Sequence, residues 1–195
     1  MLKPFAEVSN ALLVSWYCGQ EGGWSVADTL VGNVNPSGKL TITLPMSVGT
    51  LPVCHDLYEK PHRYRDCEQP VFLPFGYGLS YSQFNYSNLT CVATDNGLKV
   101  SFTVKNISQV AGKEVVQLYV TPSGDACRMR VNQLKAFSKI LLQPNQKQQI
   151  VLELPYAQLG FSQPIAPNVT ITIGPSGYEK FPPQKIYLDV NKVKV

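Results

Sequence analysis

The chain has 195 residues, a formal net charge of +4 and five cysteines. Hydrophobic residues make up 44% of it and charged residues only 15%, which excludes an intrinsically disordered chain. No apolar run approaches the roughly 18 residues that a membrane-spanning helix needs, so we expect no membrane partner. Twelve of the 17 basic residues fall in residues 84–195, but they are spread singly, which is typical of a solvated face and not of a nucleic-acid site.

Residues 1–50 have the pattern of a strand, a helix and a second strand. The apolar run at residues 11–17 predicts a strand buried on both faces, as in a parallel sheet. Val26, Ala27 and Leu30 then follow at helical spacing, with Gly32 placed to end the helix, and residues 39–44 alternate like a strand. This pattern is the C-terminal remnant of an α/β domain, and it is too small to stand alone.

Residues 51–83 predict an ordered linker, because proline, glycine and aromatic residues occur there without a sustained period. Cys54 and Cys67 are the candidates for a disulfide, which at this loop length contributes about 3 kcal/mol in the chain-entropy model. A zinc site made of these two cysteines with His55 and His62 is the weaker alternative, because the spacing matches no usual zinc motif. We therefore expect no metal and no cofactor.

Residues 84–195 predict a β-sandwich. Leu98, Val100 and Phe102 alternate with polar residues, and Asp95-Asn96-Gly97 before them is typical of a hairpin turn. Seven expected strands follow one another between Pro, Gly and Asn, at residues 85–94, 98–105, 113–121, 133–142, 147–154, 168–174 and 184–190. Such spacing indicates an immunoglobulin-like sandwich, and because neither Trp lies in this half a fibronectin type III-like variant fits best. The predicted fold is thus mainly β, with an α/β remnant in front.

Four Asn-x-Ser/Thr sequons begin at Asn85, Asn88, Asn106 and Asn168, more than this composition gives by chance. They favour a protein of the secretory pathway with N-linked glycans. The first ten residues do not have the pattern of a signal peptide, and the two observations agree if the true N-terminus lies upstream.

Candidate catalytic residues are scarce. No Gly-x-Ser-x-Gly elbow is present, which leaves a Ser-His-Asp site without its usual turn. Glu21 is the most interesting acid, because it lies in a glycine-rich turn after an expected buried strand, where ligands often bind. The competing interpretation is that Glu21 caps the helix that follows and complements its dipole.

Three ordered stretches carry a resemblance to a known family. They are Trp16 to Gly23 continuing through Ala27-Asp28 and Gly32 to Leu40; Pro74 to Tyr81 with Phe84; and Gly112 to Val120 with Leu134 to Lys139 and Leu142-Gln143-Pro144. In this order they resemble the C-terminal part of the glycoside hydrolases of family three, the β-glucosidase and β-xylosidase group. The resemblance covers nearly the whole chain.

The resemblance implies a retaining glycosidase that removes terminal β-linked glucose or xylose through a covalent intermediate. In that family an N-terminal barrel supplies the aspartate nucleophile and a second, α/β sandwich domain supplies the glutamate acid/base. A fibronectin type III-like domain comes third. Residues 1–50 correspond to the end of the second domain, residues 51–83 to a linker, and residues 84–195 to the third domain. No catalytic residue is carried over, so we expect the chain alone to be inactive.

The resemblance also places weak substrate-side candidates at Arg63, Tyr64 and Arg65, which match a Tyr-Arg stretch that can run near the active-site rim. The competing interpretation is that they tie the linker to two domains. Glu21 belongs to the family's Gly-Gln-Glu-Gly-Gly pattern but does not match its catalytic glutamate. Cys18 stands where proline is usual, and Trp24 replaces a small residue.

Two other functions stay open from the sequence. One is a non-catalytic carbohydrate- or protein-binding module, and the other is an inactive paralogue. A carbohydrate-binding face needs several aromatic residues on one strand face, whereas Tyr119, Phe137, Tyr156, Phe161 and Tyr187 are dispersed.

Overall fold

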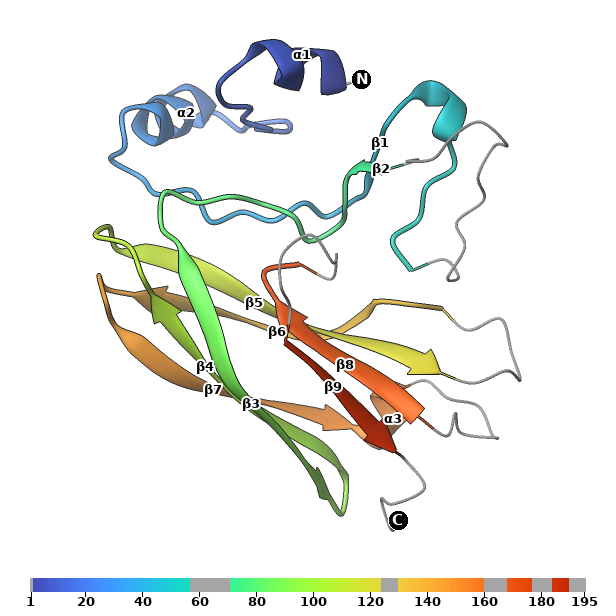
Figure 1. Ribbon diagram of the computed structural model, residues 1–195. Helices are drawn as coiled ribbons and strands as arrows, with labels where there is room; N and C mark the ends of the chain where they lie inside the picture. Colours follow the sequence, from blue (N-terminus) through green and yellow to red (C-terminus); the bar gives the residue numbers. More distant parts are fainter. Residues whose placement is uncertain (1, 57–70, 124–129, 160–167, 177–183, 190–195) are drawn as a thin grey trace.

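A computed structural model describes residues 2–56, 71–123, 130–159, 168–176 and 184–189. Figure 1 shows two parts, an N-terminal part with short helices and extended chain, and a β-sandwich below it. None of the described helices is long and apolar enough to cross a membrane.

The N-terminal part consists of α1 (Lys3–Val8), α2 (Gly22–Leu30), β1 (Leu44–Pro45), the 3-10 turn η1 (Val48–Thr50) and β2 (Val71–Leu73). The predicted helix is confirmed as α2, and Gly32 follows it with φ +84°, the left-handed conformation in which glycine ends helices. β1 pairs with β2 antiparallel, with Leu44 opposite Leu73.

The strands predicted over residues 11–17 and 39–44 are wrong as regular elements. Residues 11–17 have no strand, and Tyr17 and Trp16 are exposed. Of the second stretch only Leu44 is in a strand. A strand buried on both faces needs hydrogen-bonded neighbours and covering helices, and the described residues supply neither to residues 11–17.

The sandwich has the seven predicted strands, with bounds that differ from the expectation by at most two residues. They are β3 (Phe84–Thr94), β4 (Gly97–Asn106), β5 (Gly112–Ser123), β6 (Gln133–Leu142), β7 (Lys147–Pro155), β8 (Asn168–Gly174) and β9 (Gln184–Asp189), with the short helix α3 (Tyr156–Leu159) after β7. One sheet has the order β3-β4-β7 and the other β6-β5-β8-β9, and every pairing is antiparallel.

Strand alternation builds the core between the sheets. Leu98, Val100, Phe102 and Val104 of β4 are buried, and the residues between them face outward. β5, β7 and β8 contribute the facing apolar side chains, such as Leu118, Leu154 and Ile171. The hairpin turn before β4 ends at Gly97, where any side chain would collide with the backbone carbonyl of Leu154. The predicted alternation of apolar and polar residues in β4 is therefore confirmed.

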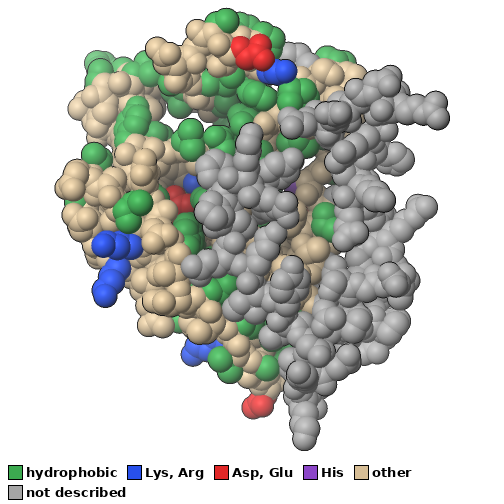
Figure 2. All heavy atoms as spheres, in the orientation of Figure 1, with side chains coloured by type: hydrophobic (Ala, Val, Ile, Leu, Met, Phe, Trp, Pro, Cys, Tyr) green, Lys and Arg blue, Asp and Glu red, His purple; other side chains and the backbone are tan. Residues whose placement is uncertain are grey.

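The N-terminal part has no such core. Neither α1 nor α2 has a buried residue. Large apolar side chains are exposed along it instead, among them Phe5 (62%), Trp24 (73%) and Leu30 (70%). Hydrophobic side chains (green) lie on the surface over this part of the molecule in Figure 2. The sandwich does not pack against these apolar side chains, and they stay exposed to solvent.

Candidate functional site

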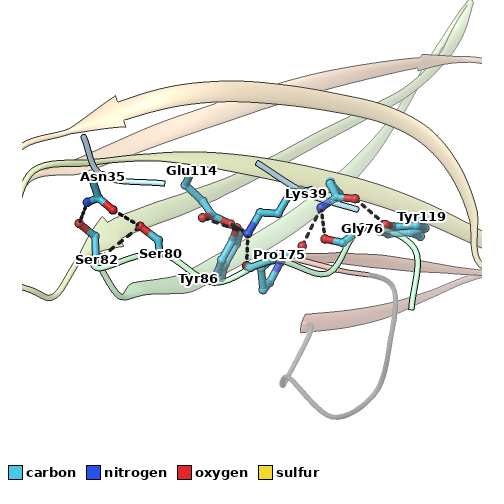
Figure 3. Close-up of polar contacts among 11 residues, drawn as sticks. Asn35, Lys39, Gly76, Ser80, Ser82, Tyr86, Glu114, Tyr119 and Pro175 are labelled. Carbon is cyan, nitrogen blue, oxygen red and sulfur yellow. Dashed lines mark hydrogen bonds and ion pairs between the residues drawn. The ribbon is translucent and has the colours of Figure 1, made fainter. Parts of the chain in front are cut away.

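The two parts meet along a polar seam (Figure 3), which we define by its hydrogen-bonded residues Asn35, Lys39, Gly76, Ser80, Ser82, Tyr86, Glu114, Gln117 and Tyr119. Two extended segments, near residues 33–43 and 74–83, run side by side over the sandwich. The amide of Leu40 donates to the carbonyl of Tyr77, and the amide of Gly76 donates to the carbonyl of Leu40, both at 2.8 Å. These ladder bonds hold the segments in register above β5.

Asn35 joins three segments. Its Nδ2 donates to Ser82 Oγ at 2.8 Å and to the carbonyl of Ala111 at 2.9 Å. Its Oδ1 accepts from Ser80 Oγ at 2.8 Å and from the amide of Tyr81 at 3.0 Å. These bonds use both donors and both lone pairs of the side-chain amide. Asn35 therefore binds the linker to the loop before β5.

Lys39 and Glu114 form a buried ion pair. Lys39 Nζ lies 3.3 Å from Glu114 Oε1, and the two side chains are only 10% and 3% exposed. Lys39 also donates to the carbonyl of Gly78 at 2.9 Å, and Tyr86 Oη donates to Glu114 Oε1 at 2.9 Å. A buried pair of this kind is stable only when further hydrogen bonds satisfy both groups, as they do here.

Burial sets the titration of this cluster. Burial raises the pKa of Glu114 above its ordinary value, and the positive charge of Lys39 with the hydrogen bonds from Tyr86 and Lys39 opposes that rise. Burial also raises the pKa of Tyr86, and the negative charge of Glu114 raises it further. Tyr86 therefore stays a neutral donor to the carboxylate.

Gly76 lies against the outward face of β5. Gln117 Nε2 donates to the carbonyl of Gly76 at 3.1 Å and to that of Pro175 at 2.6 Å, and Tyr119 Oη donates to Gln117 Oε1 at 2.5 Å. Gly76 has φ +79°, and a Cβ there would collide with Tyr119 Oη and Gln117 Oε1. Only glycine fits this contact without displacing its neighbours.

A second contact lies at the other end of the linker. Arg130 Nη1 pairs with Asp56 Oδ2 at 2.9 Å, and the amide of Val131 donates to the carbonyl of Asp56 at 3.2 Å. His55 stacks on Phe75 with ring centroids 4.3 Å apart. Burial lowers the pKa of Lys135, and the charge of Asp56 opposes that shift.

The seam is suited to docking and not to bond cleavage. Its one carboxylate, Glu114, is buried and already bound to Lys39 and Tyr86. Across the described ranges, no three His, Cys, Asp or Glu side chains come together as a metal site requires.

The predicted site residues are not assembled in the seam. Glu21 is exposed at the start of α2, and its side chain makes no capping hydrogen bond, so capping by that side chain is wrong for this structure. Arg63, Tyr64, Arg65, His62 and Cys67 lie outside the described residues. Cys54 is exposed, and its pairing with Cys67 stays a prediction.

The sequons differ in accessibility. Asn85 and Asn88 are exposed on β3, whereas Asn106 is completely buried. Asn106 Nδ2 donates to the carbonyls of Val110 and Leu142, at 2.8 and 3.2 Å. A glycan on that nitrogen does not fit this packing, so the structure does not favour Asn106 as a glycosylation site, and its modification stays a prediction. Asn168 begins β8, and its side chain lies outside what the structure describes.

Sequence reasoning did not identify the seam residues individually. One signal was available: Glu114 occupies the same strand face as Val116 and Leu118, and a charge on an apolar face needs a buried partner. The partner, Lys39, lies 75 residues away in the chain. Periodicity has no information on such a pairing.

Comparisons with known proteins agree on one family. The model of the Glycosyl hydrolase family 3 C-terminal domain matches residues 1–81, and that of the Fibronectin type III-like domain matches residues 114–175. A probable β-glucosidase J of Aspergillus fumigatus is 36% identical over 175 residues, covering 78% of this chain and 20% of that protein. A putative β-xylosidase of Formosa agariphila is 34% identical over 167 residues, covering 83% of this chain and 22% of its own.

The structure has the same fold as solved members. The crystal structure of a β-glucosidase from Listeria innocua in complex with isofagomine matches with a TM-score of 0.84 and 31% identity. The match covers 96% of this chain and 29% of the Listeria innocua chain. The chain thus spans about a fifth of the length of the curated relatives it matches. It belongs to glycoside hydrolase family 3 and corresponds to the C-terminal part of its enzymes.

Proposed function

We propose that this chain is the C-terminal portion of a retaining β-glycosidase that releases terminal β-linked glucose or xylose. The observation that carries the proposal is the agreement of both domain models, over residues 1–81 and 114–175, with the β-glucosidase and β-xylosidase relatives, which cover 78% and 83% of this chain. The substrate in the complete enzyme is a β-glycoside or oligosaccharide. Hydrolysis needs two carboxyl groups on either side of the scissile bond, and we place both in the remainder of the enzyme.

Within that enzyme the sandwich supports the α/β domain. We assign residues 1–50 to the end of the α/β domain, residues 51–83 to the linker and residues 84–195 to the fibronectin type III-like domain. The exposed apolar side chains of the first segment, such as Trp16, Tyr17 and Trp24, support a packing surface for the rest of that domain. The hydrogen bonds and the ion pair of the seam support a fixed attachment of the sandwich to the α/β domain.

Two further assignments belong to the complete protein. We assign it to the secretory pathway, which the exposed sequons at Asn85 and Asn88 support. Arg63, Tyr64 and Arg65 remain proposed contacts near the substrate, because guanidinium donors and a flat phenol ring suit sugar hydroxyls and sugar faces.

A binding module is the less favoured function. Of the aromatic residues that could form a sugar platform, Tyr119 is buried at 1% exposure, whereas Phe137 is 66% exposed. Among the side chains that the structure describes on the strands of the sandwich, Phe137 is the one exposed aromatic ring, and a single ring does not make the row that a sugar chain needs.

Assays with the pure chain test the proposal. We expect no turnover of an aryl β-glucoside or an aryl β-xyloside by residues 1–195, whereas the enzyme purified from its source turns over one or both. Clear turnover by the chain alone, abolished in a Glu21→Gln variant, would place a catalytic carboxylate in this part and contradict the proposal. The matched control is Glu153→Gln, a second exposed carboxylate, on β7.

A further inference from the structure

The two sheets present different outward faces. The sheet β6-β5-β8-β9 is covered at Gln117 and Tyr119 of β5 by the linker, through Gly76. The sheet β3-β4-β7 faces outward with mostly polar residues. Cross-strand neighbours there include Asn85 with Lys105, Thr90 with Ser101, and Lys99 with Glu153. A polar sheet face without a docked segment can carry a bulky, hydrated modification without losing packing.

Asn88 lies at an irregularity in this sheet. β3 is an edge strand, and its register with β4 shifts between Ser87 and Thr90. Asn88 has no partner in the ladder and adopts φ +55°, as the first residue of a β-bulge does when it is glycine or asparagine. Its side chain is exposed, and no described group binds its amide. The third residue of its sequon, Thr90, is exposed as well.

Asn106 provides the contrast within the same sheet. Both donor positions of its Nδ2 are occupied, by the carbonyls of Val110 and Leu142. Its Oδ1 accepts from the hydroxyl and the amide of Ser108, the third residue of its own sequon. The Asn and Ser side chains of this sequon thus form the hydrogen bonds that hold the turn between β4 and β5.

We propose that Asn88 carries an N-linked glycan on the free face of β3 and that Asn106 does not. In the transfer, Asn88 Nδ2 forms a bond to the anomeric carbon of an oligosaccharide carried on a lipid pyrophosphate. The bond from that carbon to the phosphate oxygen breaks, the lipid pyrophosphate leaves, and the amide nitrogen loses a proton. The glycan then covers an edge strand that could otherwise pair with another chain. The assignment rests on the secretory localisation proposed above.

Secretion of the full chain from a eukaryotic host behind a signal peptide tests the site. The secreted protein is treated with a peptide N-glycosidase in heavy-oxygen water, which converts each glycosylated Asn to a labelled Asp, and peptides are mapped by mass. We expect the label at position 88 and none at position 106. An unlabelled Asn88 in secreted chain, or a labelled residue 106, overturns the proposal.

A matched pair of variants separates the site from folding. Thr90→Ser keeps the sequon and should keep the glycan, whereas Thr90→Ala removes the sequon and should lose it. If Thr90→Ala is not secreted, Asn88→Gln serves as the second variant, with the same expected loss of one glycan mass. A glycan mass unchanged in the secreted variant contradicts the assignment. Because the host signal peptide supplies the route, this result is independent of localisation, which glycosidase sensitivity of the native protein tests separately.

Discussion

At the scale of single residues, the seam depends on positions that do not tolerate an added or a removed side-chain group. Gly76 has a left-handed backbone conformation and no room for a Cβ. Glu114 is a buried carboxylate whose partners come from two other segments. Both contacts join parts of the chain that are distant in sequence. Substitutions here test the docking of the linker on the sandwich.

Gly76→Ala should destabilise the chain by more than the ~1–2 kcal/mol that the left-handed conformation alone costs, because the added methyl group also displaces Tyr119 and Gln117. Gly38→Ala is the control, since it lies in the facing segment and a Cβ there meets nothing within 4 Å. Urea unfolding followed by Tyr and Trp fluorescence measures both. Equal free energies of unfolding for the two variants would refute the described contact.

Glu114 should make stability depend on pH in a defined direction. Because burial raises its pKa in the folded chain, the folded state holds a proton that the unfolded state releases above about pH 4.5. Its contribution to stability is therefore complete below that pH and decreases as the pH rises through the folded pKa. Glu114→Gln should remove this decrease, seen as a flatter series of urea midpoints from acidic to neutral pH. Glu153→Gln, an exposed control, should leave the slope unchanged, and an equal slope in Glu114→Gln would count against the assignment.

At the scale of elements, the strands of the sandwich could be predicted from sequence and the seam could not. Alternation from Leu98 to Val104 determines which side of β4 faces the core, because the opposite side carries polar residues throughout. The run at residues 11–17 has the same apolar character but no neighbouring strand in the described chain, so it stays irregular. Lys39 and Glu114 are 75 residues apart and meet only through the tertiary fold, and no local pattern contains that information.

Asn35→Ala should loosen the linker without unfolding the sandwich. The substitution leaves Ser80, Ser82 and the carbonyl of Ala111 without their shared partner, at a cost of about 1–3 kcal/mol for each polar group that stays buried and unpaired. Limited proteolysis should then cut near residues 74–83 faster than in the parent chain and leave a resistant fragment from about residue 84. Asn33→Ala is the control, because its side chain is exposed and, among the described residues, bonds to Asp28 alone. Equal cleavage rates for both variants would exclude Asn35 as a joint.

At the scale of the whole molecule, the chain combines a sandwich that has its own buried core with an N-terminal part that exposes its apolar side chains. The sandwich buries a continuous core from both sheets, whereas α1 and α2 bury none of their residues. Such an asymmetry is expected when one part completes a domain to which other polypeptide contributes. The family relatives, of which this chain spans about a fifth, have the additional length that this requires.

The mass of the native protein tests this account most directly. An antibody raised against residues 84–195 is used on an immunoblot of source extract, with and without glycosidase treatment. The account predicts a band several times heavier than 21.6 kDa, whose purified protein hydrolyses β-glucosides or β-xylosides. A single deglycosylated band near 21.6 kDa would contradict it, because the chain would then occur without the polypeptide to which we assign the catalytic carboxylates.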